Sequence, residues 1–266
     1  MTAAPAMLAA ATGSGSLVGL VLGLFGGGGS ILAVPLLVYV VGIASPHVAI
    51  GTSAVAVAAS ALGNLVPHAR AGRVKWRCAT VFALAGVAGS LAGAAAAKAV
   101  DGERLLALFG LVMVGVGLAM MRRRDMAGDP AVRLTRESAT RLLPMLIGIG
   151  FAVGLFSGFF GIGGGFLIVP GLVLATGMPL AYAIGTSLVG VAAFGAATAG
   201  SYAVSGLVDW PVAALFVAGG LVGGFAGSAL GARLASQKQA LGLAFAGLVV
   251  AVGLFILAKG FRALVA

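Results

Sequence analysis

Apolar residues dominate the chain in long runs, and polar residues gather in short breaks between these runs. Eight apolar segments can be traced, with lengths that suit helices crossing the roughly 30 Å hydrocarbon core of a bilayer. Because such runs recur along the whole chain, a cleaved signal peptide does not explain them. The pattern predicts an all-α, multi-pass membrane protein. The segments lie at residues 15–43, 47–67, 78–98, 105–121, 142–176, 181–204, 211–232 and 240–258.

The sequence is also internally repeated. GLFGGGGSILAVPLL at residues 23–37 agrees with GFFGIGGGFLIVPGL at 158–172 in nine of 15 positions, and AIGTS occurs at 49–53 and again at 183–187. Such self-similarity at a fixed spacing indicates duplicated structural units. We therefore expect two tandem repeats of about four apolar segments each. The predicted division is a first membrane repeat at 1–121, a basic cytoplasmic linker at 122–141 and a second membrane repeat at 142–266.

The first segment of each repeat contains residues that disfavour a continuous helix. Each glycine costs a helix about 1 kcal/mol relative to alanine, and proline lacks the N–H that a helix interior needs. We expect an interruption at the glycines and a second one at the helix-breaking Pro35 and Pro170. Irregular backbone at membrane depth is tolerated where it is buried in protein or lines a wet cavity. The segment is therefore either a broken crossing helix or a re-entrant hairpin.

Glycines four residues apart occur in the third apolar segment of each repeat. The pairs are Gly89 with Gly93, and Gly223 with Gly227. This spacing places two small residues on one side of a helix and lets a neighbouring backbone approach closely in lipid. We expect these positions to be helix contacts.

The charge balance changes the list of expected partners. The chain has 16 Lys and Arg against 6 Asp and Glu, a formal net charge of +10, and a mean hydropathy of +1.17. In a soluble protein this excess would suggest nucleic acid. Here the charges lie in short loops between apolar segments, so membrane lipid is the expected partner and nucleic acid is not. Formation of a homo-oligomer stays open.

Basic residues also bear on orientation. If each first segment crosses the membrane once, 12 of the 16 basic residues lie on the side of both termini, which the positive-inside rule places in the cytoplasm. If each first segment is a re-entrant hairpin, 12 again lie on one side, but the termini are then outside. The rule does not decide between the two arrangements. In both, the linker faces the cytoplasm.

The chemistry of the glycine stretches favours an anion. A half-helix that starts after the break, near Gly29 and Ser30, would present free N–H groups and the positive end of its dipole. The TS pairs within AIGTS add hydroxyls that bind an oxyanion without burying a lysine. The alternative is that the glycines serve helix packing and the hydroxyls bond their own backbone. The expected substrate-binding residues are Gly26, Gly28, Gly29, Ser30, Thr52, Ser53, Gly161, Gly163, Gly164, Gly165, Thr186 and Ser187.

Other functional classes lack the residues they require. No Asp or Glu lies within a predicted span, which argues against a cation pump. The glycine run does not end in GKS or GKT, and no span holds a Ser-His-Asp set or metal-spaced His and Cys. We expect no enzyme, no cofactor and no metal site. His68, beside basic residues, is interpreted as an interfacial residue, and Asn64 one turn earlier as a residue that faces the cavity.

These motifs together resemble one family. GLFGGGGSILAVP and GFFGIGGGFLIVP are each followed by AIGTS and then by GRVKW at 72–76 or GLVDW at 206–210, an order similar to that of the TauE/SafE sulfite exporter family of bacterial permeases. The resemblance extends from about residue 17 to residue 258, apart from the linker. It implies export of sulfite, or of organosulfonates such as sulfoacetate, across the inner membrane. Because Ile162 replaces Gly27 and Lys75 replaces an acidic residue, the two half-sites are expected to differ.

The resulting hypothesis is an inner-membrane permease. Two interrupted helices meet near the midplane and bind a small sulfur-containing anion, and rocking of one repeat against the other gives alternating access. A passive anion channel and a non-transporting membrane scaffold remain alternatives. The particular anion and the driving ion stay open.

Overall fold

The structure of the protein is a computed structural model that describes residues 5–122, 134–161, 165–233 and 238–265. These residues form helices joined by short loops, and they include no β-strand. The predicted all-α class is therefore confirmed. In chain order the elements are α1 (Pro5–Phe25), the 3-10 helix η1 (Gly26–Leu32), α2 (Ala33–Tyr39), α3 (Pro46–Arg70), α4 (Trp76–Lys98), α5 (Gly102–Arg122), α6 (Arg136–Phe160), α7 (Gly165–Thr176), α8 (Leu180–Val204), α9 (Trp210–Arg233) and α10 (Lys238–Val265).

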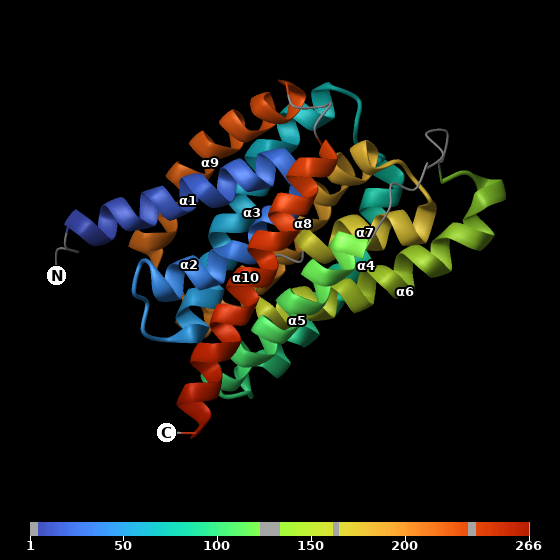
Figure 1. The fold of residues 1–266 in the computed structure, drawn as a ribbon. Helices are drawn as coiled ribbons and strands as arrows, with labels where there is room; N and C mark the ends of the chain where they lie inside the picture. Colours follow the sequence, from blue (N-terminus) through green and yellow to red (C-terminus); the bar gives the residue numbers. More distant parts are fainter. Residues whose placement is uncertain (1–4, 123–133, 162–164, 234–237, 266) are drawn as a thin grey trace.

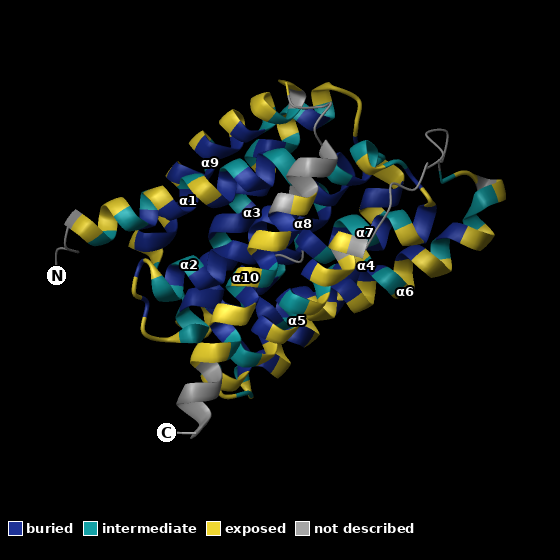
Figure 2. Ribbon diagram, in the orientation of Figure 1, coloured by how far each residue is buried: buried dark blue, intermediate teal, exposed yellow. Residues whose placement is uncertain are grey.

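Seven of the described helices are long and apolar enough to cross a membrane, namely α1, α3, α4, α5, α6, α8 and α9. The most apolar stretch of α3 is 67% buried within the protein and that of α5 only 33%, so α3 lies at the centre and α5 at the periphery. Outward faces carry large apolar side chains, such as Leu84 and Val222, each 69% exposed. Such faces suit lipid, and they alternate with buried faces along the outer helices (Figure 2). The protein is a multi-pass membrane protein.

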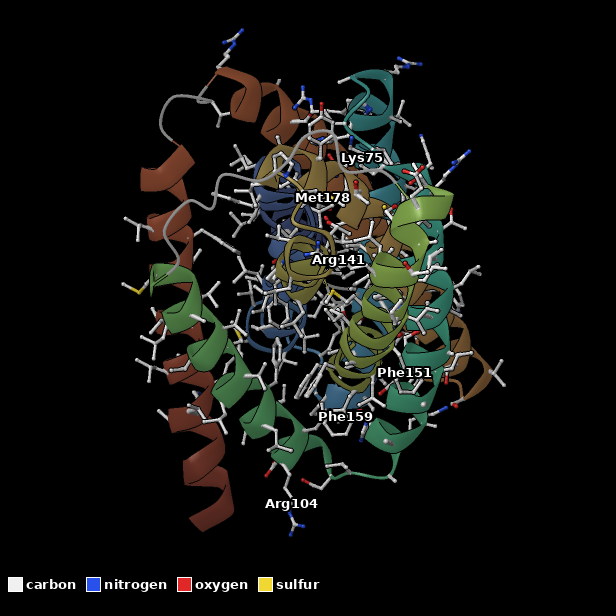
Figure 3. The ribbon with its side chains drawn as sticks, turned by 90° about the vertical axis from the view of Figure 1, so that its right-hand side faces the viewer. Lys75, Arg104, Arg141, Phe151, Phe159 and Met178 are labelled. Atoms are coloured by element: carbon white, nitrogen blue, oxygen red, sulfur yellow. The ribbon has the colours of Figure 1, made fainter. Side chains whose placement is uncertain are left out.

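The helices alternate in direction and give the molecule two ends. We call one end the linker face. It holds the α3–α4 loop (residues 71–75), the end of α5 and the start of α6. The opposite end, the terminal face, holds the α4–α5 loop (residues 99–101), the α8–α9 loop (205–209) and both chain termini (Figure 1). Figure 3 shows Lys75 and Arg141 toward the first end and Arg104 at the second.

Two seams of glycine hold the helices together. Along α1 and α9, a Cβ atom on any of several glycines would overlap the neighbouring backbone, and the same holds along α4 and α6. The predicted close approach at both glycine pairs is therefore confirmed. Within these seams, Gly89 meets Phe151, Gly93 meets Leu155, Gly223 meets Ser16 and Gly227 meets Leu20.

The helix pairs of the packing join one half of the chain to the other. α1 lies along α9 and α6 lies along α4, while α3 packs on α8 in the centre and α5 packs on α10 at the side. Each helix of the first half thus has a counterpart at the equivalent place in the second half: α6 for α1, α9 for α4 and α8 for α3. The domain limits at 1–121, 122–141 and 142–266 stay a prediction.

The first glycine stretch turns the chain back on itself. In a continuous helix Gly29 would lie roughly 10 Å along the axis from Leu22, at 1.5 Å per residue. Instead, a Cβ on Gly29 would overlap the backbone of Leu22, so η1 folds against the end of α1. Figure 1 shows α2 returning toward the end of the molecule where α1 starts. Of the two arrangements left open by the sequence, the structure has the re-entrant hairpin, and its first helix begins at Pro5 rather than near residue 15.

The second glycine stretch makes an equivalent hairpin. α6 ends at Gly161, which has φ +66°, a left-handed conformation that glycine adopts without strain. α7 then packs back along α6, with the Cβ position of Gly171 3.2 Å from Cγ2 of both Ile149 and Val153. Gly163 and Gly164 lie outside the described residues.

The prolines do not interrupt the helices, so this part of the sequence interpretation is wrong. Pro35 is the third residue of α2, where a backbone N–H would have no helical partner anyway. α7 continues through Pro170 to Thr176. In the described part of the two stretches, the chain departs from the α-helix before each proline, at η1 and at Gly161.

Candidate functional site

The two glycine turns meet in the middle of the protein. η1 packs against α7, and both lie against the central helix α8. Gly28, Gly29 and Ser30 are buried, as are Gly161 and Gly165 on the other side. The sequence-predicted stretches are thus brought together, in a tightly packed conformation.

The amides expected to bind an anion in the first glycine stretch are already used within a helix. η1 begins at Gly26, three residues before the predicted start near Gly29 and Ser30. In a 3-10 helix each N–H bonds the carbonyl three residues earlier, so the amides of Gly29 and Ser30 are used within η1. α1 runs into η1 without a gap, so the first residues of η1, Gly26 and Gly27, lie within reach of the last carbonyls of α1.

Ser53 fastens one turn to the central helix α3. Its Oγ lies 3.0 Å from the carbonyl oxygen of Gly161 and 2.8 Å from that of Ile50, and it can donate to either. A Cβ on Gly161 would overlap the side chain of Ile50, so glycine is required there for space as well as for its left-handed φ. Ser187 of α8 donates in the same way to the carbonyl of Ile184 at 2.8 Å.

Thr52 and Thr186 bind loops that lie far away in the sequence. The Thr52 hydroxyl oxygen accepts from the Asp209 N–H at 3.0 Å, and the Thr186 hydroxyl oxygen accepts from the Lys75 N–H, also at 3.0 Å. Each threonine therefore anchors the residue just before α9 or α4. A substrate contact at these positions stays a prediction, and it would have to use the hydroxyl hydrogen.

A cavity of about 280 Å³ opens beside the first turn, at the linker face. It lies between the ends of α1, α3 and α9 and the start of α8. Since a water molecule occupies about 30 Å³ of liquid, a small anion fits with part of its hydration shell. The lining residues Gly23 and Leu24 directly precede Phe25 and the glycine turn. The wall consists of Gly23, Leu24, Pro67, His68, Arg73, Ala181, Ile184, Ser228, Ala229 and Gly231.

The polar side chains of the cavity suit a negatively charged ligand. Arg73 is exposed at the mouth. His68 is only 7% exposed, and its Nδ1 has no hydrogen-bond partner within the described part of the chain. None of the lining residues is acidic. An oxyanion could therefore bind between the guanidinium and the imidazole.

Sequence reasoning missed this cavity in part. Arg73 entered only as a charge that bears on orientation, and His68 was interpreted as interfacial. Asn64 does not line the cavity: its Nδ2 donates to the Ser60 carbonyl at 2.9 Å, and the side chain packs against Gly224 of α9. The sequence signal that could have indicated the cavity was His68 and Arg73, five residues apart, next to Pro67 at the end of a predicted helix.

A multi-pass helical fold with re-entrant hairpins meeting at its centre, and with a basic cavity open to one face, defines a membrane transporter. Comparison with known proteins agrees. The family model described as "Sulfite exporter TauE/SafE" matches residues 11–256. The chain belongs to the TauE/SafE sulfite exporter family.

Individual relatives carry names of the same class. A "Probable membrane transporter protein" from Xylella fastidiosa (strain 9a5c) is 48% identical over 254 residues, which cover 96% of each chain. The "Probable membrane transporter protein YunE" of Bacillus subtilis (strain 168) is 28% identical over 246 residues, covering 84% of this chain and 88% of the relative. No solved structure gave a significant match.

Proposed function

We propose that this protein exports a small sulfur-containing anion, sulfite or an organosulfonate such as sulfoacetate, across the bacterial inner membrane by alternating access. The observation that carries the proposal is the cavity at the linker face, which is lined by His68 and Arg73, contains no acidic residue and ends where α1 enters the glycine turn. Transporter sites built from interrupted helices near the midplane use such backbone ends to bind charged substrates.

Orientation follows from the hairpins. With re-entrant first segments, only Lys98, Arg104, Lys259 and Arg262 lie at the terminal face, and the other 12 basic residues belong to the linker face or its connecting segment. The positive-inside rule then places the linker face in the cytoplasm and both termini outside. The cavity is loaded from the cytoplasm, as export requires.

Binding would proceed in two stages. Arg73 attracts an anion to the mouth, since charge-assisted hydrogen bonds to oxyanions are stronger than neutral ones, and the imidazole of His68 can add a neutral hydrogen bond. In the second stage the anion would reach the glycine turn, where a dehydrated oxyanion gains from backbone donors without a buried lysine. The glycine turn is therefore the proposed gate between the cavity and the centre of the protein.

The packing suggests which bodies move. The glycine seams join α1 to α9 and α4 to α6, so each seam connects one predicted repeat to the other. Rocking of whole repeats would pull both seams apart. We propose instead that the α1–α9 pair and the α4–α6 pair tilt in turn against the central helices α3 and α8.

The test is transport by purified protein in liposomes. Sulfite, sulfoacetate, sulfate and thiosulfate are offered in turn, with and without an imposed proton gradient. The proposal expects saturable flux of sulfite or sulfoacetate that exceeds flux of sulfate. Flux proportional to concentration for all four anions would indicate a channel, and no flux above empty liposomes would overturn the proposal.

A further inference from the structure

The terminal face carries a polar cluster that the cavity does not use, at the ends of α4 and α8. Lys98 Nζ donates to the Ser201 carbonyl oxygen at 3.2 Å, to Ser201 Oγ at 3.0 Å and to Ser205 Oγ at 3.0 Å. The same ammonium lies 5.7 Å from the ring centre of Tyr202. We call the terminal-face cluster these four residues together with His47 at the start of α3.

Two polar atoms of the terminal-face cluster are buried without a partner in the described residues. They are the hydroxyl of Tyr202, whose side chain is 0% exposed, and Nδ1 of His47. His47 lies one helical turn before Gly51, whose Cβ position is 2.9 Å from the Cβ of Tyr202, so the start of α3 meets the end of α8 here. Buried polar groups are normally satisfied, so these two point to a ligand or water that another conformation admits.

The terminal-face cluster lies at the place that is equivalent to the cavity when each half of the chain is superimposed on the other in sequence. The cavity lies between the ends of α1, α3 and α9 and the start of α8. At the terminal face the ends of α6, α8 and α4 and the start of α3 come together. With the 134-residue offset that relates the two AIGTS motifs, His68 corresponds to Tyr202 and Ala181 to His47.

This second position is closed, whereas the cavity is open. Ala94 and Ala97 stand 134 residues before the cavity-lining Ser228 and Gly231. Both alanines are 0% exposed. The bonds from Lys98 to α8 cross the place where an opening would form, and they hold the end of α4 against the end of α8.

We propose that the terminal face carries a second mouth of the transport path, which Lys98 latches shut in this structure and which opens toward the same class of small oxyanion. This inference rests on the proposed function. When the α4–α6 pair tilts away, the ammonium of Lys98 exchanges its serine partners for the anion, and the Tyr202 hydroxyl gains an acceptor. The anion then leaves on the side of the termini.

The experiment measures accessibility at Ala97. Cys78, the native cysteine, is replaced by alanine, Ala97→Cys is introduced, and right-side-out membrane vesicles are treated with a membrane-impermeant maleimide. Slow labelling is expected with Lys98 present. Lys98→Met should accelerate it at least tenfold, the shift expected when even one of its charge-assisted hydrogen bonds is lost. The double variant Ser201→Ala, Ser205→Ala keeps the charge and should also accelerate labelling, to a smaller extent.

Val204→Cys, at a position that is 92% exposed at the same face, serves as the control for reagent access. Its labelling rate should not depend on Lys98. The second mouth is overturned if neither latch variant accelerates labelling at position 97 while Val204→Cys reacts normally. Sulfite flux is measured in parallel. Accelerated labelling without sulfite flux would refute the proposed substrate and keep the mouth, whereas undiminished flux with an unreactive position 97 would refute the mouth alone.

Discussion

Arg73 gives the linker-face cavity its positive charge and His68 adds an imidazole, and the local backbone places both side chains. His68 lies in the last turn of α3, and the Arg73 N–H donates to the His68 carbonyl oxygen at 3.0 Å, which folds the α3–α4 loop over the helix end. The cavity wall therefore combines a nearly buried imidazole with an exposed guanidinium. An anion arriving from the linker face meets Arg73 first.

Replacing Arg73 should weaken substrate capture rather than turnover. For Arg73→Gln we expect the KM for sulfite to rise roughly three- to tenfold, because an exposed charge contributes less than a buried one. Arg73→Lys should fall between this variant and the parent. Initial rates in proteoliposomes over a range of concentrations provide the measurement, and an unchanged KM in Arg73→Gln would remove this residue from the entry path.

Gly28→Leu tests the glycine turn. A Cβ on Gly28 would lie 3.3 Å from Cε1 of Phe245 and 3.6 Å from the Cβ of Phe25, so a side chain there meets other side chains rather than backbone. The protein should fold in membranes, with sulfite transport abolished because the leucine fills the path. Gly28→Ala should retain part of the flux. Equal uptake by Gly28→Leu and parent vesicles would exclude this turn from the site.

Thr186→Val tests the hydrogen bond that joins α8 to the α3–α4 loop. The substitution removes the acceptor of the Lys75 N–H at a residue that is 1% exposed, and it should cost about 1 kcal/mol of stability. Thr186→Ser keeps the oxygen and serves as the control. The readout is thermal unfolding in detergent, and identical melting temperatures for the valine and serine variants would contradict the assignment.

These threonines show how far a residue can be interpreted from the sequence alone. Recurrence in both halves marked Thr52 and Thr186 as functional candidates, but a shared substrate contact and a shared structural bond produce the same recurrence. Their partners are 157 and 111 residues away, and no local pattern reveals them.

At the scale of elements, the hairpins and seams decide the architecture. The sequence located each interruption correctly at the glycines, because a run of glycine disfavours a helix wherever it lies. It could not separate a crossing helix from a hairpin, since both give the same division of basic residues. Pro35 was misinterpreted because the cost of a proline depends on its position: in the first turn of a helix no helical hydrogen bond is lost.

The seam between α1 and α9 can be tested by a matched pair of substitutions. A Cβ on Gly19 would overlap the carbonyl of Gly220, whereas a Cβ on Gly13 of the same helix has nothing within 4 Å. Gly19→Ala should therefore lower the melting temperature in detergent. Gly13→Ala should leave it unchanged or raise it, because alanine favours a helix over glycine by about 1 kcal/mol. The seam would be refuted if both variants behaved alike.

At the scale of the whole molecule, the proposed path runs from the cavity at the linker face past the central glycine turns to the terminal face. The cavity is open at the linker face, while the glycine turns and the terminal face are tightly packed. Under the proposed orientation and function, this arrangement corresponds to a transporter in a state open to the cytoplasm. A permanently open channel would require a continuous passage through the same conformation.

Counterflow separates these two behaviours in one experiment. Proteoliposomes are loaded with unlabelled sulfite and diluted into a trace of labelled sulfite, with empty proteoliposomes alongside. In loaded vesicles the sites that return outward carry mostly unlabelled sulfite, so label that has entered leaves slowly and should transiently accumulate above its equilibrium level. Equal entry of label into loaded and empty vesicles, without a transient maximum, would contradict alternating access of a sulfite site.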